Sequence, residues 1–156
     1  MTLHFAYGSN MNRSVMHKHA PEATLVGTAA LKHYRFVITA DGYASIVPKR
    51  TAVVYGVLWR LHPRDRAALD AWENVAAGLY RKEVLPLQHS GRRQMALTYI
   101  ARPGSTGRPK AGYMQLVIAA ALEWRLPQAY IASLRQWLPR RPGSEGPRKL
   151  REFEWT

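Results

Sequence analysis

The sequence contains no cysteine among its 156 residues. Disulfides, a thiol nucleophile and zinc–thiolate sites are therefore excluded, and the composition fits a reducing compartment. No basic start leads into a long apolar run, and no stretch reaches the roughly 18 apolar residues of a membrane-spanning helix. We therefore expect a cytoplasmic protein with no membrane partner.

Acidic residues are scarce: 10 Asp and Glu stand against 23 Lys and Arg, which gives a net charge of +13. The cations are spread along the chain without a dominant basic block, and signatures of RNA-recognition or helix-turn-helix modules are absent. A dispersed basic surface is more typical of a soluble protein, so we expect no specific nucleic-acid partner. A binder of polyanions or acidic proteins is the alternative that the charge leaves open. The few carboxylates also limit the candidates for acid–base catalysis.

Chain length and apolar content indicate one globular domain. With 47% hydrophobic residues, a chain of this size can bury a sizeable core. We predict that the domain spans residues 1–138 as a monomer or weak dimer. A charged tail rich in proline and glycine is predicted over residues 139–156.

Short β-rich runs dominate the first two-thirds of the chain. Strands are predicted at residues 25–31, 34–39, 44–47 and 53–61, and as a hairpin of residues 79–88 and 94–101. Gly56, inside one of these runs, predicts a close backbone approach or a bend. Helices are predicted from Pro63 to about Val75, over residues 113–125, and after Pro127 through Leu138. The strands follow one another too closely for a helix in every crossover, so the fold class is α+β, with a closed or nearly closed barrel removing exposed edges.

The stretch Leu3–Met11 predicts a strand that breaks at Gly8 into a turn and a short helical segment, with Asn10 or Asn12 as its cap. Glycine tolerates positive φ, and successive N–H groups in such a turn can point into one concavity that suits an anion. A helix that begins just after the turn adds N–H groups without partners. Any strand-to-helix turn can look like this, so the pattern alone does not establish a site.

Two common chemistries find no support in the sequence. His17 and His19 are two residues apart and face apart on a helix, and no histidine has a paired carboxylate or an HExxH pattern nearby. Ser9 does not stand in a G-x-S-x-G motif, and no His–Asp pair accompanies it. We therefore expect neither a metal site nor a serine hydrolase.

Glu73 is the carboxylate most suited to catalysis. It lies on the flank of the apolar face of its predicted helix, where desolvation raises the pKa of a carboxyl from about 4.3 towards a range useful for proton transfer. The alternative is a glutamate near a helix end that faces solvent. Tyr7, Tyr80 and Tyr113 are further candidates, and each can equally be a half-buried aromatic residue with its hydroxyl at a rim.

The segment Tyr7–Met11 (YGSNM) resembles the signature of the gamma-glutamylcyclotransferase-like proteins. Further motifs of that family are matched by residues 69–73 (LDAWE) with Gly78 and Tyr80, by residues 44–46 (ASI), and by Tyr113, Leu126-Pro127 and Tyr130. The resemblance covers about residues 3–138, and four motifs in the right order are specific where each alone is not. The sequence departs from the family at Asn74, where glycine is common, and this puts the choice of substrate in question.

The resemblance implies a small mixed β-barrel with surrounding helices and a cavity, and it implies no cofactor. The implied reaction converts a γ-glutamyl amide or γ-glutamylamine to 5-oxoproline and a free amine or amino acid. Glu73 is implied as the acid/base, and the residues implied to bind the small γ-glutamyl substrate are Tyr7, Gly8, Ser9, Asn10, Tyr80 and Tyr113. The alternative within the same fold is a non-catalytic protein that binds a small carboxylate.

Overall fold

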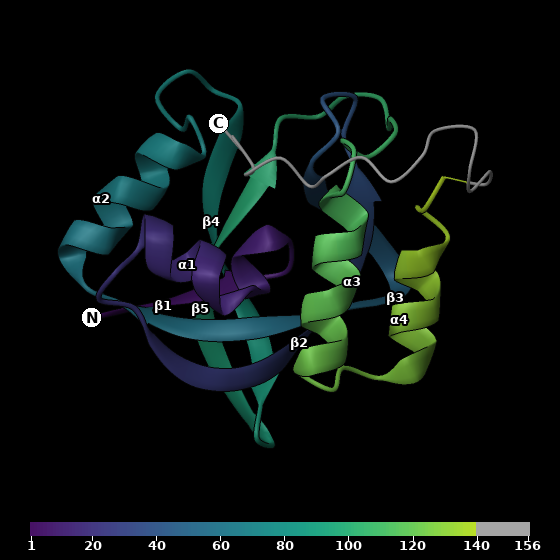
Figure 1. Cartoon of the computed structure of the whole chain (residues 1–156). Coiled ribbons are helices and arrows are strands. Elements are labelled where there is room, and N and C mark those ends of the chain that lie inside the picture. Colours follow the sequence, from purple (N-terminus) through teal and green to yellow (C-terminus); the bar gives the residue numbers. More distant parts are fainter. Residues whose placement is uncertain (140–156) are drawn as a thin grey trace.

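Five strands of the computed structural model close into one barrel, flanked by helices (Figure 1). The strands are β1 (Thr2–Ala6), β2 (Thr24–Ile38), β3 (Ala44–Leu61), β4 (Tyr80–His89) and β5 (Arg92–Ala101). Their order is β1-β3-β2-β4-β5, and a parallel pairing of β1 with β5 closes a sheet that is otherwise antiparallel. The α+β mixed barrel expected from the sequence is confirmed. The structure describes residues 1–139, so the tail predicted for 139–156 lies outside the described residues from position 140 on.

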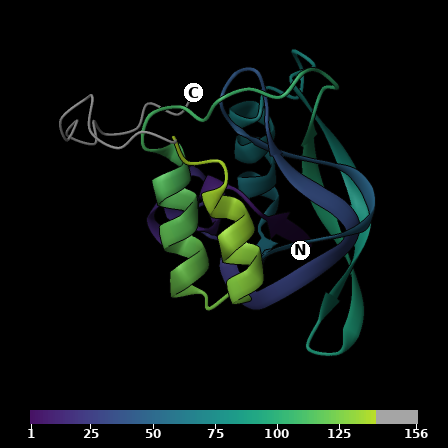
Figure 2. The same cartoon turned by 90° about the vertical axis from the view of Figure 1, so that its right-hand side faces the viewer.

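The helices divide between two flanks of the barrel. They are the 3-10 helix η1 (Ser9–Met11), α1 (Arg13–His19), α2 (Pro63–Trp72), α3 (Tyr113–Glu123) and α4 (Gln128–Arg135). Helices α3 and α4 lie side by side on one flank, and α2 lies on the other (Figures 1 and 2). Asn12, one of the two predicted caps, caps α1 by accepting a hydrogen bond from the Val15 N–H at 3.0 Å. Within residues 1–139, no helix combines the length and apolar character needed to cross a membrane.

Strands β2 and β3 are longer than the sequence predicted. The runs predicted at 25–31 and 34–39 form one strand. Its pairing with β3 is interrupted at His33 (φ 70°), opposite residues 49–52, and resumes where Tyr34 pairs with Pro48. The runs at 44–47 and 53–61 also join, with Pro48 paired opposite Tyr34. The prediction of four separate strands was therefore wrong, and the two long strands form one bent ribbon that makes up much of the barrel wall.

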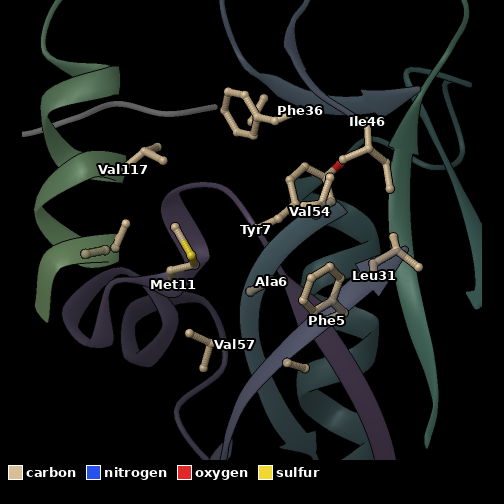
Figure 3. Packing of buried hydrophobic residues seen from close by; sticks show 14 of the residues in the cluster. Phe5, Ala6, Tyr7, Met11, Leu31, Phe36, Ile46, Val54, Val57 and Val117 are labelled. Carbon is tan, nitrogen blue, oxygen red and sulfur yellow. The ribbon is translucent and has the colours of Figure 1, made fainter. Parts of the chain in front are cut away.

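The core lies where the barrel interior meets η1 and α3 (Figure 3). Phe5, Leu31 and Val54 from the strands share it with Met11 and Val117 from the helices. A Cβ at Gly56 would overlap the Ala6 carbonyl oxygen and come within 2.7 Å of the Phe5 ring. The close approach that the sequence predicted at this glycine is confirmed, and it lets β1 pack tightly against β3.

His4 is buried in the barrel wall as a neutral ring. Its side chain is 2% exposed, its Nδ1 lies 3.1 Å from the Leu97 carbonyl oxygen, and its ring packs edge-on against Tyr99. Burial lowers the pKa of His4 from 6.5 to about 4, although the hydrogen bond to Leu97 opposes this shift. At Nδ1 the neutral ring therefore carries the proton that it donates to Leu97.

This histidine is expected to make the fold sensitive to acid. The unfolded chain binds the His4 proton near pH 6.5 and the folded chain only near pH 4, so stability is lost as pH falls between these values. The loss reaches about 3 kcal/mol. Thermal unfolding from pH 7 to pH 4.5 should show a smaller fall in Tm for His4→Phe than for wild type. The exposed His17→Gln variant is the control and should follow wild type; an unchanged slope in His4→Phe would contradict the prediction.

Candidate active site

A cavity of about 1020 Å³ opens between the turn after β1, the start of β3, the end of α2 and the loop of residues 102–112. Every residue that the sequence marked as a candidate lines it: Tyr7, Gly8, Ser9, Asn10, Glu73, Tyr80 and Tyr113. These residues come from five separate elements or turns, so the fold brings together positions far apart in the chain.

The loop of residues 102–112 is fixed to the turn between β2 and β3 by backbone hydrogen bonds. The Ala40 N–H donates to the Ser105 carbonyl at 3.1 Å, and the Gly107 N–H donates to the Ile38 carbonyl at 2.9 Å. The Lys110 N–H donates to the Gly42 carbonyl at 3.1 Å. The loop therefore forms an ordered wall at one side of the cavity.

Gly8 is required by space and not by its backbone angles. Its φ is −109°, outside the left-handed region, so this turn does not use the positive φ that glycine tolerates. A Cβ at Gly8 would lie 2.8 Å from the Tyr113 hydroxyl oxygen and 3.1 Å from the Ala44 Cβ. Glycine is thus the residue that lets the turn lie against α3 and the start of β3.

The turn continues as a single 3-10 turn. The Met11 N–H donates to the Gly8 carbonyl at 3.1 Å and the Asn12 N–H to the Ser9 carbonyl at 3.0 Å, so the N–H groups of Ser9 and Asn10 have no acceptor inside the helix. Ser9 instead hydrogen-bonds to the Tyr113 hydroxyl. Asn10 is 7% exposed, and its Oδ1 has no hydrogen-bond partner within the described residues.

Two tyrosine hydroxyls hold the backbone of Ala44 between them. The Tyr80 hydroxyl donates to the Ala44 carbonyl at 2.8 Å, and the Tyr113 hydroxyl accepts from the Ala44 N–H at 3.2 Å. Burial, with the nearby Glu73 charge as a lesser cause, raises the pKa of both phenols, to about 12 for Tyr113. Both hydroxyls therefore stay protonated at neutral pH and act as fixed dipoles in the cavity wall.

Glu73 is the residue at which α2 ends. The helix stops at Trp72, three residues before the predicted end near Val75, because Asn74 adopts the left-handed conformation (φ 50°). The Asn74 N–H bonds to the Ala71 carbonyl and the Val75 N–H to the Asp70 carbonyl, each at 3.1 Å, which is a Schellman termination. Asparagine is the residue that best replaces glycine in this conformation, so the departure from the resembled family at Asn74 leaves this turn possible.

The Glu73 carboxyl is desolvated but remains on the cavity wall. Burial raises its pKa from 4.5 to about 7. Across the part of the chain that the structure describes, the carboxyl forms no hydrogen bond or ion pair that would stabilise its charge. The negative charge of Glu73 contributes to the raised pKa values of four tyrosines, Tyr7, Tyr80, Tyr99 and Tyr113. A carboxyl that titrates near neutral pH beside a cavity is suited to accept and return a proton.

The sequence did not point to Tyr99 or Ser45 as parts of this site. The carbonyl of Tyr99 accepts a hydrogen bond from the Tyr7 hydroxyl, while its own hydroxyl donates to Asp70. The Ser45 Oγ accepts from the Ala101 N–H at 2.9 Å. Tyr99 lies opposite Lys82 in the β4–β5 hairpin, and its partners depend on strand register, which the sequence alone does not give.

Within residues 1–139, no three His, Asp or Glu side chains gather in a way that could hold a metal ion. Besides tyrosine hydroxyls and the Glu73 carboxyl, other polar and charged residues line the cavity, among them Ser9, Asn10, Asp41, Arg102 and Lys110. This set is suited to bind a small polar molecule and to transfer a proton within it.

Comparisons with known proteins identify a family for the chain and a shared fold. A model of the AIG2-like family matches residues 53–134. The curated gamma-glutamylcyclotransferases of Mus musculus and Homo sapiens are each 26% identical over 144 residues, which cover 85% of this chain and 77% of theirs. A solved structure named gamma-glutamyl cyclotransferase superposes with a TM-score of 0.83 at 23% identity over 91% of both chains, and shows the same fold. YkqA from Bacillus subtilis reaches 0.77 at 25% identity over 86% of this chain and 53% of its own.

Proposed function

Because the chain belongs to the AIG2-like family and is similar to curated gamma-glutamylcyclotransferases, we propose that it is a cyclotransferase. It converts a γ-glutamyl amide or γ-glutamylamine to 5-oxoproline and a free amine or amino acid. The observation that carries this proposal is the desolvated Glu73 carboxyl, which shares one cavity with the Gly8–Asn10 turn. We propose Glu73 as the acid/base and the turn as the site for the substrate carboxylate.

The reaction needs no nucleophile from the protein, because the α-amine of the substrate attacks its own γ-carbonyl. A new C–N bond between the α-nitrogen and the carbonyl carbon of the γ-carboxyl group closes the five-membered ring, and the bond from that carbon to the leaving amine nitrogen breaks. Glu73 takes a proton from the attacking nitrogen and returns one to the leaving nitrogen, so the carboxyl ends in its starting state. A cavity that holds the glutamyl chain bent, with amine and carbonyl in contact, supplies several kcal/mol through proximity.

The rest of the cavity wall supports the roles proposed for the other candidates. The Asn10 N–H, which has no acceptor inside η1, is a donor for a carboxylate, while hydrogen bonds from Ser9 to the Tyr113 hydroxyl hold the turn in place. Asn10 carries a buried acceptor without a partner among residues 1–139, which an amine of the substrate would satisfy. Tyr7, Tyr80 and Tyr113 remain neutral and shape the cavity around the bent chain.

The proposal is tested by mass spectrometry for 5-oxoproline after incubation with γ-glutamyl-alanine, γ-glutamyl-butylamine and ε-(γ-glutamyl)-lysine. The control is α-glutamyl-alanine, whose γ-carboxyl carries no leaving amine. Release of 5-oxoproline from at least one γ-glutamyl compound is expected. Saturable binding without product would favour the non-catalytic carboxylate binder. If none of the γ-glutamyl compounds is bound or converted, the proposal is wrong.

The net charge of +13 favours one further candidate, a binder of polyanions, and makes a separate prediction. We expect weak binding to a duplex of random sequence at about 50 mM salt that disappears by about 200 mM, as for a few nonspecific phosphate contacts. Fluorescence anisotropy across this range measures it. Sub-micromolar binding that survives at the higher salt would instead establish the polyanion binder.

A further inference from the structure

Asp70 joins the end of α2 to both strands of the β4–β5 hairpin. Its Oδ2 accepts from the Lys82 Nζ at 2.8 Å, and its Oδ1 accepts from the Tyr99 hydroxyl. Lys82 and Tyr99 are directly opposite one another in the register of the hairpin. Two residues that face each other across the hairpin therefore donate hydrogen bonds to the same carboxylate. The side chains of Asp70 and Lys82 are each 28% exposed.

The main chain of Asp70 takes part in the turn that carries Glu73. Its carbonyl accepts the Val75 N–H at 3.1 Å, which is one of the two hydrogen bonds that terminate α2. Glu73 lies between these two residues, at the position where the helix ends. Asp70 thus fixes the Glu73 turn through its backbone and fixes the same helix end to the barrel through its side chain.

We propose that Asp70, gripped by Lys82 and Tyr99, is a positioning residue that holds Glu73 at the cavity opposite the Gly8–Asn10 turn. This inference rests on the proposed cyclotransferase function for its catalytic consequence, but its structural part stands on the contacts alone. We call the three residues the Asp70 clamp.

Tyr99 extends the clamp to the other half of the site. Its carbonyl accepts the hydroxyl proton of Tyr7, the residue immediately before the Gly8 turn, while its hydroxyl reaches the helix that ends at Glu73. One residue of β5 therefore connects the segment proposed to bind the carboxylate with the segment that carries the acid/base.

Charge explains why the clamp contains a lysine. Burial alone would raise the pKa of Asp70, but hydrogen bonds from Lys82 and Tyr99 and the charges of Lys82 and Arg66 keep it below its usual value. Asp70 therefore stays ionised while Glu73, one helical turn away, titrates near neutral pH.

The groups that face Glu73 from neighbouring elements are the hydroxyls of Tyr7, Tyr80, Tyr99 and Tyr113, all with raised pKa values. On its own helix, Trp72 is stacked on His19 of α1.

Four variants test the clamp. Asp70→Ala removes both side-chain contacts, Lys82→Met removes one and keeps an unbranched apolar stem, and Lys82→Arg restores a donor. Arg81→Met is the matched control, because Arg81 is the neighbouring cation on β4 and pairs with Glu83. The first readout is the pKa of the Glu73 carboxyl by ¹³C NMR, with the signal assigned by its loss in Glu73→Gln. The second is kcat and KM for 5-oxoproline release from γ-glutamyl-alanine.

In Asp70→Ala the loosened helix end admits water, so the Glu73 pKa should fall by about 1 or more towards its usual value. The kcat should fall about 10–100-fold with KM changed less than about threefold, since misplacing a catalytic group lowers the rate while the carboxylate site is untouched. Lys82→Met should shift both readouts in the same direction by smaller amounts, about 3–10-fold in kcat, and Lys82→Arg should recover wild-type values within about twofold.

The proposal is overturned if Asp70→Ala and Lys82→Met keep a Glu73 pKa within about 0.3 of that of Arg81→Met, or if their loss is confined to KM. If Asp70→Ala does not fold, Lys82→Met decides alone. If the wild-type protein releases no 5-oxoproline, the proposed function fails, and the NMR titration still decides whether the clamp holds Glu73.

Discussion

Replacing Glu73 by glutamine is expected to lower the rate of 5-oxoproline release by about 10²–10⁴-fold, the usual contribution of a positioned acid–base group. Glutamine keeps the shape of the side chain and can still hydrogen-bond, but it cannot shuttle a proton. Affinity for a γ-glutamyl ligand should therefore stay within a few-fold of wild type. Single-turnover kinetics and equilibrium binding on the same preparation separate the two effects.

The matched control is Glu83→Gln, which removes an equal charge from the surface of β4, where Glu83 pairs with Arg81. This variant should keep wild-type activity. Cyclising activity within a few-fold of wild type in Glu73→Gln would mean that another group carries the proton. In the wild-type enzyme, the activity should also fall as pH drops through about 7, because Glu73 must be ionised to accept the proton.

The Glu73→Gln variant should be more stable than wild type above neutral pH. Folding raises the pKa of Glu73 from 4.5 to about 7, so the stability of the wild-type fold is lost as pH rises through this interval. Since the side chain is partly exposed, we expect a gain of about 1–3 kcal/mol for Glu73→Gln at pH 8 that vanishes near pH 4.5. Denaturant unfolding at both pH values measures it. A stabilised but inactive variant is the usual signature of a group kept for function.

Local patterns in the sequence predicted most of the elements and the cluster of candidate residues. Pro63 marked the start of α2, and the Ser90-Gly91 turn marked the β4–β5 hairpin. The long strands β2 and β3 could not be predicted, because a bulge at His33 and a proline opposite Tyr34 look like strand ends in a sequence. In the folded barrel, pairing between β2 and β3 continues on either side of the bulge and the proline, so each strand is continuous.

Candidate residues that belong to short sequence motifs could be predicted. Residues whose partners lie on other strands, far away in sequence, could not. The end of α2 depends on Asn74 adopting the left-handed conformation, so the predicted helix ran too far, although Glu73, the carboxylate singled out from the sequence, does line the cavity. Tyr99 was missed because its two partners, Tyr7 and Asp70, are fixed by barrel closure and hairpin register. Distances between segments 29 and 92 residues apart in sequence cannot be obtained from motif spacing.

Adding a side chain at Gly8 should have the second large effect, a loss of substrate binding with a modest loss of stability. A Cβ there would lie 2.8 Å from the Tyr113 hydroxyl and 3.1 Å from the Ala44 Cβ. Gly8→Ala must displace the turn or Tyr113, and Gly8→Val adds two methyl groups to the same crowded space. We expect reduced affinity for a γ-glutamyl ligand in Gly8→Ala and no measurable binding in Gly8→Val, by calorimetry. Gly104→Ala is the control for crowding, since Gly104 lines the same cavity but a Cβ there meets nothing closer than 3.9 Å.

A double-mutant cycle separates this steric cause from a general loss of fold. Tyr113→Phe removes the hydroxyl that the new Cβ would strike, and the next Tyr113 atom lies 4.0 Å away. In that background Gly8→Ala should cost about 1 kcal/mol less of unfolding free energy than in wild type, because two groups in direct contact do not act additively. Equal costs in both backgrounds would mean that Tyr113 does not set the limit at Gly8. The turn would then owe its glycine to the contact with Ala44, and Ala44→Gly should relieve Gly8→Ala instead.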